Sequence, residues 1–181
     1  MKNLKLLGLL KICAFFSTNI IAQTKIVGGA EMFPTKNIVE NAMNSKDHTT
    51  LVAALKAADL VSTLESRGPF TVFAPANSAF AALPAGTVEN LLKPENKKTL
   101  TSILTYHVIS GKFSAEDLMK RVNKENGKAT MRTVQGENLY FTMKGGKLMI
   151  TDSKGNTTDI TIADVNQSNG VIHVIDKVLM P

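Results

Sequence analysis

The sequence predicts one α+β domain in which short helices come first and an antiparallel, strand-rich half follows. Two observations support this prediction. Apolar residues recur mainly at helical spacing from residue 35 to residue 119, and from Ala129 onward they alternate at strand spacing. In addition, 181 residues with 44% hydrophobic and 20% charged content suit a single domain, since domains usually span roughly 100–200 residues.

Residues 1–22 have the basic, apolar and small-residue regions of a secretory signal, in that order. Lys2 and Lys5 precede the apolar segment, which ends at Ala22. Lys11 interrupts that segment, whereas a membrane anchor needs about 20 uninterrupted apolar residues. We therefore expect an exported chain that is periplasmic, on the cell surface or extracellular, with no membrane span after the signal is removed.

Removal of this signal changes the chemistry that the chain can support. The single cysteine, Cys13, leaves with it, which excludes disulfides, thiol catalysis and thiolate metal sites from the mature chain. The formal net charge of +6 falls to +3 because Lys2, Lys5 and Lys11 leave as well. That excess is small and mixed with acidic residues, so nucleic acid is not an expected partner.

Residues 23–34 are interpreted as a linker that Pro34 closes. The segment Ile-Val-Gly-Gly at residues 26–29 matches the processed start of trypsin-like proteases, but no serine lies in a Gly-x-Ser-x-Gly context. We treat the match as chance, because short motifs often match by accident. The folded domain is then expected to cover residues 35–181.

The first half of this domain is predicted to contain short amphipathic helices and one buried strand. Apolar periodicity places helices at residues 35–45, 49–58 and 59–66. Residues 70–74, Phe-Thr-Val-Phe-Ala, are almost free of polar side chains, as expected of a strand covered on both faces. Pro75 should end the pairing, because it cannot donate a ladder hydrogen bond.

Capping residues mark the starts of the next helices. Pro84 and Gly111 are expected to end two of them. The predicted starts are Asn77 before 78–83, Thr87 before 88–92, Pro94 in the first turn of 94–110, and the Ser114 and Asp117 capping box before 115–119.

The second half is predicted to be a series of strands separated by polar and glycine-rich turns. Gly145-Gly146 is a two-residue link of the kind that closes β-hairpins. The expected strands are residues 129–134, 137–144, 147–152, 158–165 and 170–180.

Three segments in this order resemble the fasciclin domain family: PFTVFAPANSAFAALP at 69–84, LTYHVISGKFSAEDL at 104–118 and NGVIHVIDKVLMP at 169–181. The resemblance runs from about Pro34 to Pro181. It implies a compact β-sandwich or wedge with several short helices packed around it. It also implies a non-catalytic extracellular adhesion module.

The resemblance further implies candidate partner-binding residues. Some animal members of the family are thought to engage integrins through an Asp-Ile pair before the C-terminal segment and through residues around a central Tyr-His pair. Tyr106 and His107, and Asp164 and Val165, occupy these positions here. Residues 162–163, Ile-Ala, stand where the family usually has Glu-Pro. This departure argues against integrin binding and leaves general surface adhesion.

Each of these residues also has a purely structural interpretation. His107 and His173 lie within apolar patterns that suit hydrogen-bonded core histidines. Tyr106 can bury its ring and bond its hydroxyl to the backbone. Asp164 precedes a turn, where aspartate commonly accepts hydrogen bonds from local amides.

Neither an enzyme nor a cofactor nor a metal site is expected. His48, His107 and His173 fall on different predicted elements, with no carboxylate at metal-binding spacing, and no phosphate-binding glycine loop is present. The favoured function is a monomeric adhesion or interaction module that binds an extracellular protein or glycan. The alternative is a small-ligand carrier or sensor of the cell envelope. A deep apolar pocket would favour the carrier, and a shallow exposed patch near Tyr106 or Asp164 would favour adhesion.

Overall fold

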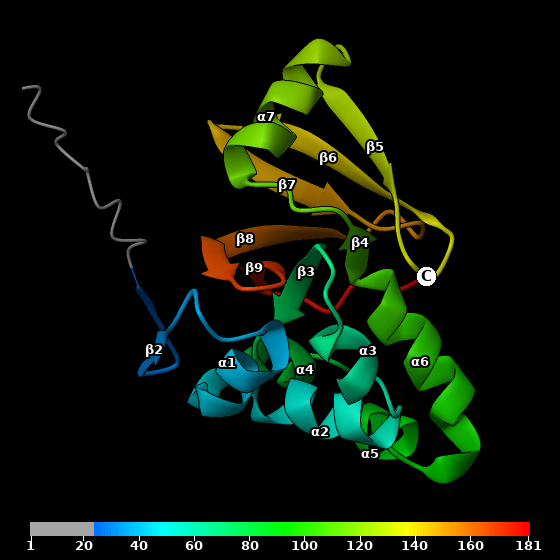
Figure 1. The fold of residues 1–181 in the computed structure, drawn as a ribbon. Helices are drawn as coiled ribbons and strands as arrows, with labels where there is room; N and C mark the ends of the chain where they lie inside the picture. Colours follow the sequence, from blue (N-terminus) through cyan, green and yellow to red (C-terminus); the bar gives the residue numbers. More distant parts are fainter. Residues whose placement is uncertain (1–23) are drawn as a thin grey trace, which may run out of the picture.

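A computed structural model of the chain describes residues 24–181, and the predicted export signal lies outside this range. The domain contains a seven-stranded sheet with the strand order β4-β3-β9-β8-β7-β6-β5. Helices α1 to α6 gather on one side of this sheet, and α7 lies at its opposite end (Figure 1). The predicted α+β class and the wedge with short helices around it are confirmed.

The helices of the first half are all short, as predicted. Two 3₁₀ turns, Lys46–His48 and Pro94–Asn96, precede α2 and α6. The α-helices are α1 (Ile38–Asn44), α2 (Thr49–Ala57), α3 (Val61–Glu65), α4 (Asn77–Ala81), α5 (Thr87–Leu91), α6 (Lys97–Tyr106) and α7 (Ala115–Lys124).

Two of the predicted helix caps are wrong. Asn77 is already the first residue of α4, and its side chain turns toward the neighbouring helix. It accepts a hydrogen bond from the backbone N–H of Thr50 (3.0 Å) and donates one to the carbonyl of Lys46 (2.9 Å). Thr87 is likewise inside α5, which begins after Gly86 at φ +80°. Asn77 therefore ties two helices together instead of capping one.

The predicted helix at 94–110 ends earlier, at Tyr106. Residues Val108–Ser110 form strand β4, which pairs antiparallel with β3 from Val72 to Phe70. The apolar spacing of these residues fits either a helix or a strand, but Val108 and Ile109 are β-branched and lose side-chain freedom in a helix. Pairing with the buried strand β3 therefore favours the strand.

The strands of the second half occur close to the predicted ranges, except that the last one, β9, ends at Ile175 instead of continuing to residue 180. Strand β3 pairs parallel with β9, and the other neighbouring pairs are antiparallel. The two-glycine turn joins β6 to β7, with Lys144 opposite Lys147. The strands are β3 (Phe70–Pro75), β4 (Val108–Ser110), β5 (Lys128–Arg132), β6 (Asn138–Lys144), β7 (Lys147–Thr151), β8 (Thr157–Gln167) and β9 (Gly170–Ile175).

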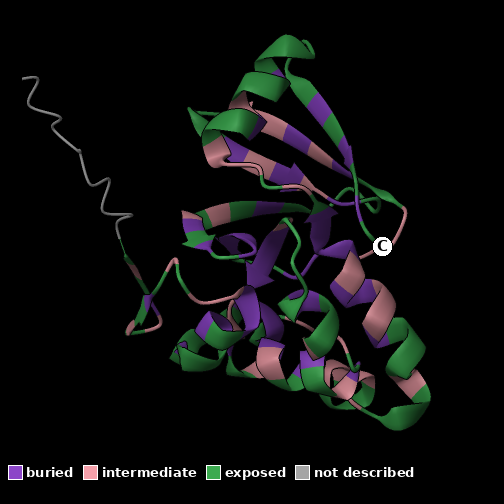
Figure 2. Ribbon diagram, viewed as in Figure 1, coloured by how far each residue is buried: buried purple, intermediate pink, exposed green. Residues whose placement is uncertain are grey.

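Buried side chains form two cores on opposite faces of β3 and β9, and Figure 2 shows these central strands as largely buried. Val72 and Ala74 of β3 face one core, and Phe73 faces the other. The prediction that residues 70–74 are covered on both faces is therefore confirmed. The helical core includes Ile38, Val39, Leu51, Leu55, Leu100, Leu104, Ile172 and Val174. The wedge core includes Phe73, Tyr106, Leu118, Val122, Leu139, Phe141, Ile150 and Ile175.

The long strand β8 bends the sheet around the wedge core. Its pairing with β9 shifts register between Ile160 and Ile162 and again between Ile162 and Val165. Such bulges bend a strand and increase its twist. As a result the far end of the sheet returns to β4, where the N–H of Val134 donates to the carbonyl of Val108 (2.8 Å). The sheet is therefore nearly closed.

The interpretation of residues 23–34 as a linker needs correction. Most of this segment is a hairpin made of β1 (Lys25–Val27) and β2 (Ala30–Met32). Val27 and Met32 are each 3% exposed and belong to the helical core. Gly28 has φ +59°, and a Cβ there would lie 2.4 Å from the Oγ of Ser45, so only glycine fits. The hairpin packs on the domain as part of it.

Candidate functional site

Tyr106 is fully buried at the end of α6. Its hydroxyl donates to the carbonyl of Asn138 and accepts from the N–H of Ser153, both at 2.9 Å. Burial raises the pKa of the Tyr106 phenol, so the hydroxyl keeps its proton at neutral pH. The structural interpretation is confirmed, because Tyr106 fills the wedge core and holds the turn between β7 and β8 in place.

His107 follows α6 directly and is 3% exposed. Its Nε2 lies 3.0 Å from the backbone nitrogen of Leu179, and its Nδ1 lies 2.8 Å from the carbonyl oxygen of Ile103. Since the Leu179 N–H can only donate, Nε2 accepts, and Nδ1 carries the proton that it donates to Ile103. Burial lowers the pKa of His107 to about 4. The neutral ring thereby holds the C-terminal segment against α6.

Asp164 lies at the second bulge of β8, with φ +55°. Its carboxylate accepts a hydrogen bond from the N–H of Ala115, the first residue of α7, at 2.7 Å. The Asp164 N–H donates to Nδ1 of His173 (3.2 Å), while Nε2 of the same ring bonds the carbonyl of Phe113 (2.9 Å). His173 is thus a satisfied core histidine, as predicted. Asp164 bonds α7 instead of local turn amides.

The start of α7 has a second polar anchor. Ser114 and Asp117 form the predicted capping box, in which the Ser114 side chain accepts from the Asp117 N–H at 3.1 Å. Hydrogen bonds from Ser114 lower the pKa of Asp117, which stays ionised. Together with Asp164, this carboxylate lies at the positive end of the helix dipole. The position of α7 on the sheet is therefore well determined.

Three of the four candidate partner-binding residues are inaccessible. Tyr106, His107 and Val165 are 0%, 3% and 1% exposed. A partner could not touch them in the folded protein, and Asp164 is only half-buried. Val165 packs in the helical core. Tyr106, His107 and Asp164 support the surface above them through hydrogen bonds, and that surface contains two open grooves.

The first groove, here called the C-terminal groove, has a volume of about 570 Å³. One wall is the turn from Asp152 to Thr158, and the other is residues 177–180. Asp152 connects the walls, because its carboxylate accepts from the N–H of Met180 (3.2 Å) and of Asn156 (2.8 Å). Tyr106 supports one wall through Ser153, and His107 supports the other through Leu179.

The second groove, here called the α7 groove, has a volume of about 550 Å³. It lies between α7 and strand β8, with the β6–β7 turn at one end. Asp164 supports its α7 wall through the hydrogen bond to Ala115. The other lining residues are Met119, Gly146, Lys147, Leu148, Asp159, Ile160, Thr161, Ala163 and Asp176.

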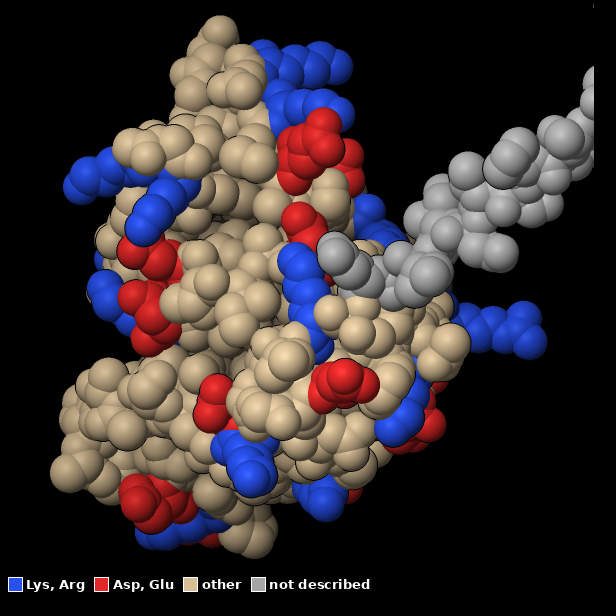
Figure 3. Space-filling model, turned by 90° about the vertical axis from the view of Figure 1, so that its left-hand side faces the viewer, with Lys and Arg blue, Asp and Glu red and all other residues tan. Residues whose placement is uncertain are grey.

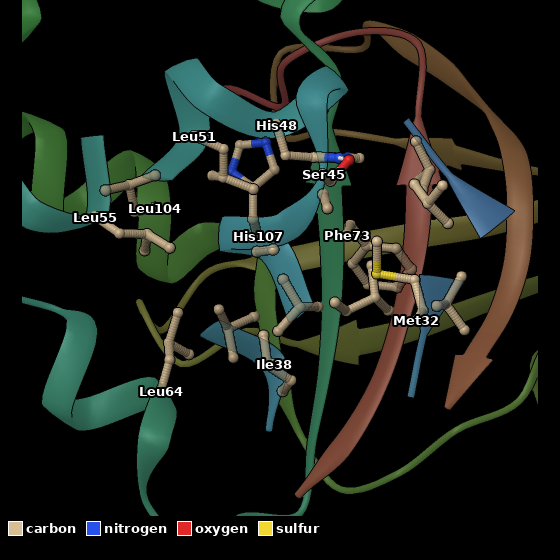
Figure 4. A pocket seen from close by; sticks show the side chains of 18 residues that line it. Met32, Ile38, Ser45, His48, Leu51, Leu55, Leu64, Phe73, Leu104 and His107 are labelled. Carbon is tan, nitrogen blue, oxygen red and sulfur yellow. Dashed lines mark hydrogen bonds between the residues drawn. The ribbon is translucent and has the colours of Figure 1, made fainter. Parts of the chain in front are cut away.

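The helical core also contains an apolar cavity of about 30 Å³, whose lining side chains converge from several helices and strands (Figure 4). Its polar lining consists of Ser45, His48 and His107. Nδ1 of His48 bonds the Oγ of Ser45 at 2.8 Å. Within residues 24–181, His48 Nε2 is the one buried side-chain nitrogen or oxygen without a partner. The cavity has room for about one water molecule.

Residues 24–181 contain no group of three or more His, Cys, Asp or Glu side chains that could hold a metal ion. None of their helices is long and apolar enough to cross a bilayer. On the face drawn in Figure 3, basic and acidic side chains alternate over the surface and no large area has a single sign.

Comparison with models of protein families identifies the family to which this fold belongs. The model of the fasciclin domain matches residues 46–181, which include both grooves and their supporting residues. This chain belongs to the fasciclin domain family. The resemblance that the three sequence segments predicted is therefore confirmed.

Individual relatives agree with this assignment. Protein sll1483 of Synechocystis sp. is 48% identical over 159 residues, which cover 88% of this chain and 81% of that protein. The cell surface glycolipoprotein MPB83 of Mycobacterium bovis is 37% identical over 145 residues, covering 77% of this chain and 58% of that protein. A solved FAS1 domain pair from the insect cell adhesion molecule Fasciclin I is similar in fold, with a TM-score of 0.70 and 19% identity over 81% of this chain and 51% of that chain.

Sequence reasoning missed a further buried residue, Asn169. Its Oδ1 accepts from the N–H of Ile38 (3.0 Å), and its Nδ2 donates to the carbonyls of Leu64 (2.7 Å) and Ser66 (2.9 Å). The adjacent Gly170 has no room for a side chain, because a Cβ would lie 2.1 Å from the carbonyl oxygen of Phe70. The sequence places Asn169 only in the link before the last predicted strand, whereas the structure shows that it joins α1 and α3 to the sheet.

Proposed function

We propose that this chain is an exported, non-catalytic interaction module of the fasciclin type, which binds an extracellular protein or glycan at the cell surface or in the envelope. One observation carries the proposal. The residues that mark the family are buried supports for the walls of two open grooves, which is the arrangement expected of a rigid recognition surface. Both ring nitrogens of His107 and of His173 make hydrogen bonds, which leaves them unsuited to acid–base chemistry. His48 has an unpartnered Nε2, but it is buried and lines neither groove.

The relatives support the same class of function. A cell surface protein and a cell adhesion molecule are among the proteins to which this chain is similar. A surface module needs a stable scaffold and an exposed contact area, and both grooves are open to solvent. The predicted signal at residues 1–22 would deliver the chain to the compartment in which such a partner is present.

A second candidate, a small-ligand carrier or sensor, is favoured by the apolar cavity and its unpartnered His48. Its size argues the other way. A cavity that binds benzene measures about 150 Å³, whereas this one measures about 30 Å³. A carrier would therefore have to open the helical core, which an interaction module need not do.

The test is binding of the mature chain to whole cells, to envelope glycans and to a panel of extracellular proteins that includes integrin ectodomains. Lys177→Glu changes the charge of the C-terminal groove, and Met119→Arg blocks the α7 groove. Lys98→Glu, on the exposed side of α6, is the matched control for the charge change. We expect saturable binding to at least one member of the panel. One of the groove variants should lower the affinity at least tenfold, and the control should leave it unchanged. Absence of binding to every member of the panel would overturn the proposal.

A further inference from the structure

The outer face of the β5–β6–β7 part of the sheet, which points away from the wedge core, has an unusual composition. In β5 the alternation leaves Lys128, Thr130 and Arg132 exposed, while Ala129 and Met131 are buried. The same alternation continues across β6 and β7. Every position on this face can therefore be assigned from the register.

Three lysines meet at one end of this face. Lys144 and Lys147 lie directly opposite each other across the two-glycine turn, and Lys128 lies opposite Thr142, two residues before Lys144. Opposed side chains on a sheet have Cβ atoms about 5 Å apart and diagonal neighbours about 7–8 Å apart, and like charges placed this closely repel. Within residues 24–181 none of these lysines is in a salt bridge, so no direct ion pair offsets that repulsion.

An aromatic ring lies in the middle of the same face. Tyr140 is half-exposed, and its strand neighbours are Thr130 on one side and Thr151 on the other. The Nζ of Lys128 lies 4.2 Å from the ring centroid, a cation–π contact. Arg132 lies at the end of β5 that is farther from the lysines. The centre of the face therefore combines an aromatic ring with hydroxyl groups, and basic residues stand at both ends.

The carboxylates near this face lie at its borders. Glu125 is at the free edge of β5, where it accepts from the N–H of Thr130 and from Arg121. Asp159 is on β8, opposite Met149 of β7, and together with Asp176 it lines the same groove as Lys147. Neither interrupts the row formed by Lys128, Lys144 and Lys147, so this row favours a partner with several negative charges.

We propose that this basic sheet face, defined as Lys128, Arg132, Tyr140, Lys144 and Lys147, binds an acidic polysaccharide. Carboxylate or sulfate groups pair with the lysines, and a sugar ring packs on Tyr140 with its hydroxyls bonded to the neighbouring threonines. A protein partner fits less well, because the face lacks a cluster of buried apolar anchors. Nucleic acid fits less well because the predicted signal at residues 1–22 would export the chain from the compartment in which nucleic acid is abundant.

This inference rests on the proposed interaction function and names its partner class. The experiment measures binding of the mature chain to immobilised polygalacturonate and to neutral dextran, at 50 and 300 mM salt (about 14 and 6 Å Debye length). We expect binding to the acidic polymer only, with at least a tenfold loss at the higher salt. A triple variant, Lys128→Glu with Lys144→Glu and Lys147→Glu, should bind polygalacturonate at least tenfold more weakly than the wild type at 50 mM salt.

The matched control reverses three exposed lysines on the helical side, Lys56→Glu, Lys93→Glu and Lys98→Glu, for the same change in net charge. Thermal unfolding of both triple variants confirms that they are folded. Equal losses in the two variants would mean that net charge alone acts, and would overturn the assignment of the face. Tyr140→Ala should lower polygalacturonate binding but not binding to polyglutamate, and an equal loss for both polymers would overturn the sugar contact.

The outcomes separate this inference from the proposed function. If the mature chain does not bind polygalacturonate but binds cells or an extracellular protein, the basic sheet face is not a glycan site, and the proposed interaction function is still supported. If it binds nothing in either experiment, both fail. Binding to the acidic polymer that survives in the triple variant places the contact elsewhere on the domain, which also overturns the inference.

Discussion

The two cores of this domain differ in how completely their polar groups are satisfied. In the wedge core, Tyr106 uses its hydroxyl twice and His173 uses both ring nitrogens. The helical core contains a cavity of about 30 Å³, and His48 Nε2 there has no partner. The polar groups that support the groove walls are thus all hydrogen-bonded, whereas one buried nitrogen behind the helices is not. We expect the wedge core to tolerate substitution poorly and the helical core to tolerate it well.

The largest effect is expected at the centre of the wedge core. Phe73 is 0% exposed, and its ring centroid lies 5.6 Å from those of Phe141 and of His173. Phe73→Ala should lower the free energy of unfolding by about 3–5 kcal/mol, because the cavity it leaves lies between fixed strands. Chemical denaturation measures this loss, with the exposed Val134→Ala as the control. A loss below about 1 kcal/mol would show that this core is not tightly packed.

His107 should make stability depend on pH. Its pKa is about 4 in the folded protein, below the ordinary value of 6.5, so folding favours the neutral ring. The stabilisation is complete above pH 6.5 and is lost as the pH falls toward 4, by about 3 kcal/mol over that window.

The measurement compares wild type with His107→Gln, which cannot titrate. The difference in unfolding free energy between the two should shrink by about 3 kcal/mol between pH 7 and pH 4. His48 and His173, whose pKa values burial also lowers, titrate in both proteins and cancel. A difference that stays constant with pH would contradict the buried neutral ring.

A smaller loss is expected from Tyr106→Phe. The change keeps the ring but leaves the N–H of Ser153 and the carbonyl of Asn138 without their partner. An unsatisfied buried group costs about 1–3 kcal/mol, and the partial exposure of this turn places the effect near the lower end. Amide exchange should accelerate at Ser153 more than in α2. Uniform acceleration over the whole chain would mean that Tyr106 supports the fold in general and not this wall of the groove.

The elements that could be predicted from the sequence have strong local signals. The two-glycine turn, the capping box at Ser114 and the apolar strand at 70–74 each follow from a few neighbouring residues. The β1–β2 hairpin could not be predicted, since its strands have three residues each and no measurable period. The fit of Val108 to a helical stripe likewise could not reveal its pairing with β3.

The candidate site was predictable only in part, for a related reason. Tyr106, His107 and Asp164 were found through the family resemblance, and their structural roles followed from their residue types. The grooves that they support could not be predicted, because their walls are joined by hydrogen bonds between distant segments, Met180 to Asp152 and Leu179 to His107. The exposed basic face also depends on the register of three strands, because a one-residue shift of a strand would move its side chains to the opposite face of the sheet. Local signals therefore located the supports, and the exposed surface needed the structure.

The smallest effect is expected in the helical core, and it separates the two cores most sharply. His48→Leu combined with Ser45→Ala removes the unpartnered Nε2 of His48 and the hydrogen bond between His48 Nδ1 and the Ser45 hydroxyl, so that neither polar side chain is buried. Replacing both partners with apolar groups is often neutral or stabilising, so the double variant should lie within about 1 kcal/mol of wild type. His48→Leu alone leaves the buried Ser45 hydroxyl without a partner and should be less stable than the double variant. Denaturation of the three proteins tests this order. If the double variant loses as much as Phe73→Ala, the helical core is as intolerant as the wedge core, and the unpartnered nitrogen cannot be taken as a sign of incomplete packing.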